Sequence, residues 1–142
     1  MNKNPSNTLF NVKRLLGRDF DDPFIQENMK YWPYKVVKEF GSGRPKIEIN
    51  INNEQKFYYI EEILAMELLK IKQTASKYLG KEVKEAVIGV PNYFNFAQRQ
   101  MIRDAAKISG LKVNYTIGGP NLAACQYQFD YLDFNKKEEK IS

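Results

Sequence analysis

The sequence has no histidine and a single cysteine, Cys125, among its 142 residues. A disulfide needs two thiols, and most zinc sites need histidine or several cysteines, so both are excluded within this chain. A histidine general base is excluded as well. An unpaired intracellular cysteine usually packs as a small apolar group, so we expect Cys125 to be buried in a helix.

The sequence also lacks long apolar runs and any gathering of basic residues. No stretch approaches the ~20 apolar residues of a membrane span, and the first residues lack the apolar core of a signal peptide. We therefore expect a cytoplasmic protein without a membrane partner. The net charge of +5 comes from 22 basic and 17 acidic side chains, which are scattered from Lys3 to Lys140. Because nucleic-acid surfaces normally gather their basic residues, we expect no nucleic-acid partner.

The stretch around residue 90 predicts a strand, a turn and a helix. Ala86–Val90 is short and apolar on both faces, as expected for a parallel strand with helices on each side. Pro91 ends the strand, because proline cannot donate to the ladder. Asn95 and Gln98 have the spacing of a capping box, so a helix begins there. It ends at Gly110.

A second strand–helix pair follows directly. Leu111–Ile117 predicts another strand, and Gly118-Gly119-Pro120 predicts a turn into a helix over Leu122–Tyr127. Residues 131–142 are polar and charged, and we expect them to form a solvated tail. The sequence thus predicts a partial α/β half over about residues 83–130.

Residues 5–80 predict a lobe of helices and antiparallel strands. The lobe begins with a helix from Asn7 or Thr8 to Gly17, followed by a short helix that begins at Asp21-Asp22-Pro23. Its longest helix begins near Glu61. The apolar stripe of this helix predicts core residues at Ile60, Leu64, Leu68, Ile71, Ala75 and Tyr78. Three strands are expected at Tyr34–Val37, Lys46–Ile51 and Gln55–Tyr59, with an Asn52-Asn53 hairpin turn and with Lys46, Glu48 and Asn50 on a solvent-exposed face.

Several ordered strings stand out along the chain. They include Lys13-Arg14-Leu15-Leu16-Gly17-Arg18, Phe20-Asp21-Asp22-Pro23, Trp32-Pro33-Tyr34-Lys35-Val36-Val37, Val90-Pro91-Asn92-Tyr93-Phe94-Asn95 and Ile108-Ser109-Gly110-Leu111. In order and spacing they resemble the ATPase domain of the 70-kDa heat-shock (DnaK-type) chaperones. The resemblance runs from about Asn7 to about Asp130, and long ordered strings of this kind are specific. It implies an α/β fold, more fully an α+β lobe plus a partial α/β half, forming an incomplete actin-like ATPase domain.

The resemblance places altered residues where the family has its chemistry. The family has Asn-Glu-Pro-Thr at residues 118–121, and its glutamate lies near the magnesium ion and the attacking water. Gly119 replaces that glutamate, so no catalytic residue, metal ligand or cofactor-binding residue is expected in this chain. The positions that help to receive the J-domain co-chaperone are degenerate. They are Tyr115, Gly118 and Asn121, where the family has arginine, asparagine and threonine.

Pro91 and Arg99 match a family proline and arginine that are associated with relaying the nucleotide state. Each also has a simpler interpretation, since a proline ends a strand and an arginine is common on an exposed helix face. A glycine pair before a helix could hold an anion, although it is more often only a turn. Adjacent carboxylates such as Asp21 and Asp22 do not face one another on a helix, so they predict no acid/base pair.

The family hydrolyses ATP with magnesium and drives the binding and release of unfolded polypeptide. The resemblance implies that the first phosphate loop lies upstream of this chain, whereas the second phosphate loop and the adenosine pocket lie downstream. We therefore expect a truncated, degenerate member that uses no cofactor. The alternatives are an interaction module that binds chaperone cofactors or a full-length relative, and an incomplete or decayed gene. Self-association through exposed sheet edges is also expected.

Overall fold

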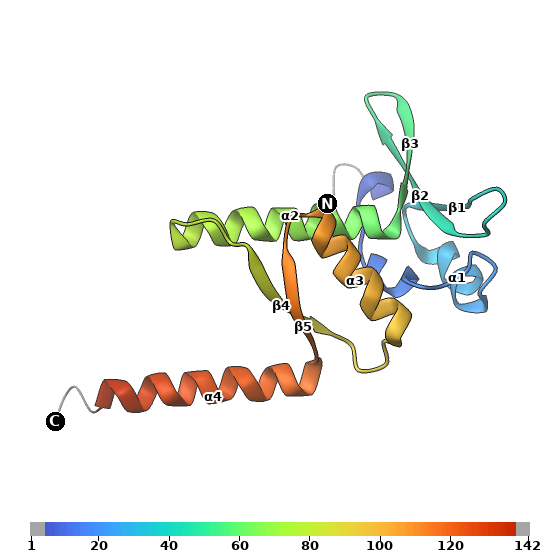
Figure 1. Ribbon diagram of the computed structural model, residues 1–142. Coiled ribbons are helices and arrows are strands. Elements are labelled where there is room, and N and C mark those ends of the chain that lie inside the picture. Colours follow the sequence, from blue (N-terminus) through green and yellow to red (C-terminus); the bar gives the residue numbers. More distant parts are fainter. Residues whose placement is uncertain (1–4, 139–142) are drawn as a thin grey trace.

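The computed structural model describes the backbone of residues 5–138 and the side chains of residues 6–128 (Figure 1). Four α-helices, five strands and three short 3₁₀ turns make up this part of the chain. In chain order they are η1 (Pro5–Asn7), η2 (Val12–Leu15), α1 (Pro23–Asn28), η3 (Met29–Tyr31), β1 (Lys35–Lys38), β2 (Pro45–Ile51), β3 (Glu54–Tyr59), α2 (Ile60–Leu79), β4 (Glu85–Val90), α3 (Phe96–Ile108), β5 (Lys112–Gly118) and α4 (Gly119–Glu138).

The predicted antiparallel sheet is confirmed, with the order β1-β2-β3. Asn52 and Asn53 both have positive φ, at 52° and 65°, as a two-residue hairpin turn requires. The prediction that Glu48 lies on a solvent-exposed face is wrong, because its side chain is only 8% exposed. Its carboxylate pairs with Lys35 at 2.7 Å and accepts a hydrogen bond from Gln55. Burial of this charge is therefore compensated by two partners.

The helix predicted over residues 7–17 is wrong. This segment contains the end of η1 and the single 3₁₀ turn η2, because Asn11 takes a left-handed φ of 56° that interrupts any helix. The segment still contributes to the core, since Leu15 and Leu16 are fully buried. Gly17 ends the segment at φ 67°, a conformation that favours glycine.

Helix α2 is packed over only part of its length. Ile60 and Leu64, in its first turns, are buried, whereas Ile71 and Tyr78 in the second half are 61% and 90% exposed. The prediction that the whole stripe is core is therefore wrong for those two residues. Figure 1 shows the reason, since the first turns of α2 lie under the antiparallel sheet and the helix then extends past it.

The predicted strand–helix–strand unit is confirmed. β4 and β5 pair in parallel, and α3 begins at the Asn95 cap, where Gln98 completes the capping box. The expectation that β4 is buried on both faces is wrong, because Val87 is 49% exposed while Val90 is buried. α3 packs on one face of this two-stranded sheet and α2 packs against α3, whereas the opposite face stays largely open (Figure 1).

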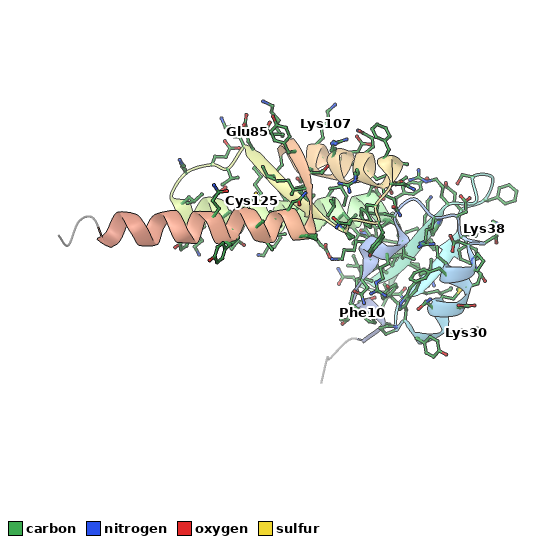
Figure 2. All side chains as sticks on the ribbon, turned by 90° about the horizontal axis from the view of Figure 1, so that it is seen from below. Phe10, Lys30, Lys38, Glu85, Lys107 and Cys125 are labelled. Atoms are coloured by element: carbon green, nitrogen blue, oxygen red, sulfur yellow. The ribbon has the colours of Figure 1, made fainter. Side chains whose placement is uncertain are left out.

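Helix α4 projects away from the rest of the molecule (Figure 1). Residues 121–128 are all exposed, including Cys125, so the prediction of a buried cysteine is wrong (Figure 2). The expected tail is also corrected in part, because residues 131–138 continue the helix. Residues 139–142 lie outside the described part of the chain.

One apolar cluster joins the two halves of the chain. It contains Leu15, Ile25 and Ile47 from the lobe together with Phe94 and Ile102 from the strand–helix–strand unit. The antiparallel lobe and the parallel unit together give the α/β class that the sequence predicted. The domain boundaries expected at residues 80, 83 and 131 stay predictions. The apolar cluster contains residues from both sides of residues 80 and 83. No helix in the described residues is long and apolar enough to cross a membrane.

Candidate functional site

The carboxyl ends of β4 and β5 meet at one edge of the parallel sheet. Val90 pairs with Gly118, so Pro91 and Gly119 are the residues that follow the two strands at this edge. In open α/β sheets, ligands bind outside the carboxyl ends of the strands, where helix N-termini also point. This edge is therefore the candidate site, and the structure brings Pro91, Gly118 and Gly119 together there.

The edge offers no carboxylate to a metal ion. An ideal Cβ at Gly119 would meet no atom within 4 Å, so the space in front of α4 is open. Asn121 lies in the first turn of α4 with its side chain exposed. Across residues 6–128, no group of three or more histidine, cysteine, aspartate or glutamate side chains is placed to hold a metal ion.

Gly118 is in close contact with the turn that follows β4. A Cβ at position 118 would lie 2.0 Å from the side-chain oxygen of Asn92, so any larger residue requires Asn92 to move. The side chain of Asn92 thus occupies the room that a side chain at 118 would need. The turn after β4 and the last residue of β5 therefore fit one another.

Arg99 holds the turn between β4 and α3. Its Nε donates to the carbonyl oxygen of Phe94 at 3.0 Å, and Asn95 and Gln98 exchange the two capping hydrogen bonds at 2.9 and 3.0 Å. Phe94 is buried in the core that both halves share. The position of Arg99 is thus explained by turn geometry, and its relay role stays a prediction.

Tyr115 lies away from the other candidate residues. It pairs with Val87, whereas the next pair, Ile88 and Thr116, faces α3, because Arg103 of α3 donates to the Thr116 hydroxyl at 3.4 Å. Since alternate residues of a strand face opposite sides, Tyr115 lies on the open face, where it is 70% exposed. The three co-chaperone positions Tyr115, Gly118 and Asn121 therefore lie on β5 and the start of α4, with only Gly118 in contact with the turn after β4.

A cleft separates the lobe from α3. Its volume is about 240 Å³, and Arg18, Arg44, Glu61 and Met101 are among its lining residues. Arg44 is committed to Glu61 at 2.6 Å, and its guanidinium stacks over the Tyr59 ring at 4.6 Å. Because this charge is paired within the cleft, the cleft presents little net charge to a ligand.

A polar cluster lies next to Arg44 in the lobe, where Lys46 also lies over the Tyr59 ring. Lys46 pairs with Glu39 at 2.6 Å, and Ser42 and Tyr59 also donate to Glu39. These bonds, the Lys46 contact first, lower the pKa of the Glu39 carboxyl to about 2. The sequence showed no signal for this cluster, since its members are spread over residues 39–59 and meet only through the pairing of β1, β2 and β3.

A second pocket lies between η2, α1 and α3, and residue patterns alone did not predict it. Its walls carry two arginines and three aromatic rings, from Arg14, Arg18, Phe24, Tyr93 and Phe94, together with Gln98. The one local signal for this pocket is the spacing of Arg14 and Arg18, which are four residues apart. That signal is weak because the segment is not an α-helix.

Comparison with known proteins gives a consistent result over the whole chain. The family described as Hsp70 protein matches residues 1–142. The chain is 49% identical over 138 residues to the putative heat shock 70 kDa protein 7 of Homo sapiens, which covers 97% of this chain and 37% of that protein. It is 45% identical to the heat shock cognate 70 kDa protein 3 of Dictyostelium discoideum, over 97% of this chain and 22% of that protein.

A third relative, the heat shock 70 kDa protein of Neurospora crassa, is 47% identical over 89% of this chain and 19% of its own length. The chain therefore spans between 19% and 37% of the length of these three relatives.

Proposed function

The chain belongs to the Hsp70 family, and from this premise we propose that residues 1–142 by themselves neither bind nor hydrolyse ATP. The observation that carries the proposal is Gly119. It occupies the position of the family's glutamate by resemblance, and the space beside it is open. Phosphoryl transfer depends on positioned groups that hold metal, water and phosphate, and a hydrogen atom cannot replace a carboxylate in that role.

The neighbouring glycine supports the same proposal. The family's asparagine at position 118 would overlap Asn92, whose side-chain oxygen lies 2.0 Å from the position of the added Cβ. The edge of this sheet is thus packed for glycine at 118, and a return to the family's residue would require the Asn92 side chain to move.

Isothermal titration calorimetry with ATP and ADP in the presence of magnesium tests the proposal. We expect no heat of binding from this chain and clear binding by a full-length 70-kDa heat-shock relative under the same conditions. A dissociation constant in the micromolar range or tighter would contradict the proposal.

Repair of the altered residues provides a second test. Gly119→Glu with Asn121→Thr should leave phosphate release at the buffer level, because one carboxylate acts only on a phosphate that other groups already hold. The added charge should stabilise the N-terminus of α4 by at most about 1 kcal/mol. Phosphate release that appears in the double variant, and disappears when residue 119 is returned to glycine, would show a complete site.

We further propose that the chain acts as an interaction module of the chaperone system, binding a chaperone cofactor or a full-length relative. Exposed aromatic rings favour this role, because Tyr31 of the lobe and Tyr93 and Phe96 of the strand–helix–strand unit are each more than two-thirds exposed. Tyrosine is a residue type enriched at binding hot spots. Biolayer interferometry with immobilised full-length relative should show saturable binding, and a flat response up to high micromolar concentrations would oppose this role. The cytoplasmic location and the lack of a nucleic-acid partner stay predictions.

A further inference from the structure

We propose that the pocket between η2, α1 and α3 binds a short acidic peptide segment in which a carboxylate adjoins an aromatic side chain. This inference rests on the proposed interaction role and makes it specific. The pocket has a volume of about 180 Å³ and is lined by Arg14, Arg18, Phe24, Tyr93, Phe94 and Gln98. Three separate segments of the chain thus converge on it.

Arg14 supplies the charge that a ligand would meet. Its side chain is exposed, and its guanidinium makes no hydrogen bond or ion pair within the described part of the chain. The planar fork of an arginine matches the two oxygens of a carboxylate, which it can bind through two parallel hydrogen bonds. Because Arg14 lines the pocket and its guanidinium is uncommitted, the pocket favours an anionic partner.

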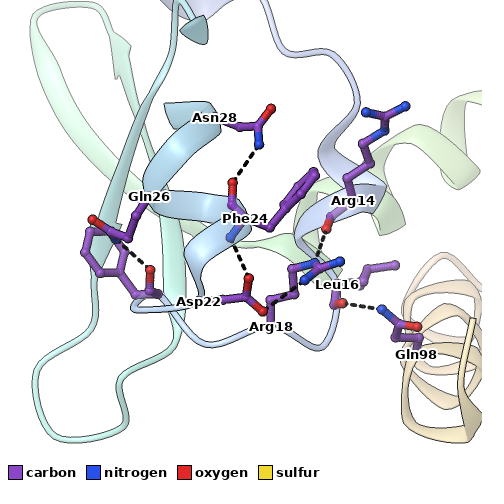
Figure 3. A network of polar contacts seen from close by, with 9 residues as sticks. Arg14, Leu16, Arg18, Asp22, Phe24, Gln26, Asn28 and Gln98 are labelled. Carbon is purple, nitrogen blue, oxygen red and sulfur yellow. Dashed lines mark hydrogen bonds and ion pairs between the residues drawn. The ribbon is translucent and has the colours of Figure 1, made fainter. Parts of the chain in front are cut away.

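Arg18 is held in place by the lobe itself. Its Nη1 donates to Asp22 at 2.9 Å, its Nε donates to the carbonyl oxygen of Arg14 at 3.1 Å, and its guanidinium lies 4.5 Å from the centre of the Phe24 ring (Figure 3). The other oxygen of Asp22 accepts the backbone N–H of Phe24 at 2.8 Å as the cap of α1. The negative charge of Asp22 thus neutralises the positive charge of Arg18. Arg14 has no acidic partner within residues 6–128, so its positive charge is not neutralised.

The opposite wall of the pocket is aromatic. Tyr93 is 71% exposed, and its ring packs edge-on against the buried Phe94 at 5.5 Å between ring centres. The hydrogen bond from Arg99 to the Phe94 carbonyl oxygen fixes this turn. Tyr93 is therefore an exposed ring on a rigid support, which can pack against an aromatic or apolar side chain at small entropic cost.

The third wall is the N-terminal turn of α3. The Gln98 amide donates to the carbonyl oxygen of Leu16 at 2.9 Å and accepts the N–H of Asn95, so its polar atoms are already used (Figure 3). This side of the pocket therefore limits only the shape of a ligand. The charge of a ligand is recognised by the arginines.

The size of the pocket selects among occupants. Sites for drug-sized ligands occupy roughly 300–1,000 Å³, so a pocket of about 180 Å³ holds one side chain and little more. A nucleic acid would need a wider basic surface than one free guanidinium. A ligand that places one aromatic side chain beside Tyr93 and Phe24, and a neighbouring carboxylate against the Arg14 guanidinium, would match both the aromatic and the basic wall.

Fluorescence anisotropy with two labelled peptides tests the proposal. The first probe has the sequence Gly-Ser-Asp-Phe-Asp-Ser-Gly, and the second replaces both aspartates by asparagine. We expect saturable binding of the acidic probe, weakening as salt is raised, and at least about tenfold weaker binding of the amide probe, since charge-assisted bonds are lost.

Variants of Arg14 separate charge from geometry. Arg14→Gln should weaken binding of the acidic probe at least about tenfold, and Arg14→Lys about threefold, because lysine keeps the charge but not the fork. Tyr93→Ser should remove the preference for a probe with phenylalanine over one with serine at the same position. The control Lys107→Gln also removes one exposed positive charge, at the far end of α3, and should leave the affinity within about twofold.

Circular dichroism of each variant checks that it is folded. Equal binding of the acidic and amide probes, or wild-type affinity in Arg14→Gln, would overturn the proposed site. The broader interaction role has its own test, since a full-length relative that binds wild type and Arg14→Gln equally well would support an interaction module and reject this pocket. If wild type binds neither the acidic probe nor the full-length relative, both proposals are rejected.

Discussion

The two halves of the chain contain sheets that differ in how they meet solvent. The lobe has a three-stranded antiparallel sheet, and the largest fully buried side chains, Leu15, Leu16, Ile25 and Ile47, all belong to the lobe. The second half has a two-stranded parallel sheet with one open face and the projecting helix α4. An antiparallel sheet can leave one face in water, whereas parallel strands are normally covered on both faces. We therefore infer that the lobe supplies most of the stability of this chain.

Truncation of a buried side chain should show this contrast most strongly. Ile47→Ala in β2 should lower the free energy of unfolding by about 2–5 kcal/mol, because it opens a cavity in the fully buried core. Val87→Ala on the open face of β4 should cost less than about 1 kcal/mol, since the side chain is half exposed. Urea unfolding followed by circular dichroism measures both, and similar losses in the two variants would remove the distinction.

Amide hydrogen exchange should be slower in the lobe than in the second half of the chain. Protection should be high in residues 60–68 of α2 and lower in β5 and α4, because amides in sparsely packed elements exchange through local opening. A difference of about 100-fold corresponds to about 2.7 kcal/mol in opening free energy. Uniform protection across residues 60–128, together with a strictly monomeric protein, would contradict both this contrast and the expected association of open sheet edges.

The contact between the halves can be weakened at Gln98. This side chain donates to the carbonyl oxygen of Leu16 in the lobe and also closes the capping box of α3. Gln98→Ala should lower the unfolding free energy by about 1–2 kcal/mol, because it removes a cap and leaves a partly buried carbonyl unpaired. The neighbouring Gln100→Ala removes only exposed contacts with Asp104 and Arg103 and should change stability by less than about 0.5 kcal/mol.

Lowering the pH should change the free energy of unfolding less than the substitutions above do. One carboxylate in each half, Glu39 and Glu85, should contribute to this change. The hydrogen bond from Lys46, with those from Ser42 and Tyr59, lowers the pKa of Glu39 from 4.5 to about 2, and hydrogen bonds from Asn114 and then Lys112 lower the pKa of Glu85. Each carboxylate thus favours the folded state above its ordinary pKa, and this contribution is lost as the pH falls through the lowered value.

For Glu39 the window lies between pH 4.5 and about 2. The urea midpoints of wild type and Glu39→Gln should differ at pH 6 and converge toward pH 2, and Glu85→Gln gives the matched comparison in the second half. A constant difference over this range would contradict the assigned role of Glu39.

The sequence predicted local features well. Asp22-Pro23 begins α1, Asn95 with Gln98 begins α3, and Asn52-Asn53 forms a hairpin turn, as expected. The family resemblance is likewise confirmed over the whole chain. Of the candidate site, the sequence placed Pro91 and Gly118-Gly119 at strand ends correctly, but it did not predict that Asn92 fills the space beside Gly118.

What the sequence determined by itself is where α1, α3 and the hairpin turn between β2 and β3 begin, since a cap or a hairpin turn depends on hydrogen bonds between residues at most four apart. The tertiary structure alone decided which faces are covered. Identical apolar spacing leaves Leu64 buried and Tyr78 exposed, and pairing with Lys35 buries Glu48. Burial depends on neighbours that are distant in the sequence, so no local pattern encodes it.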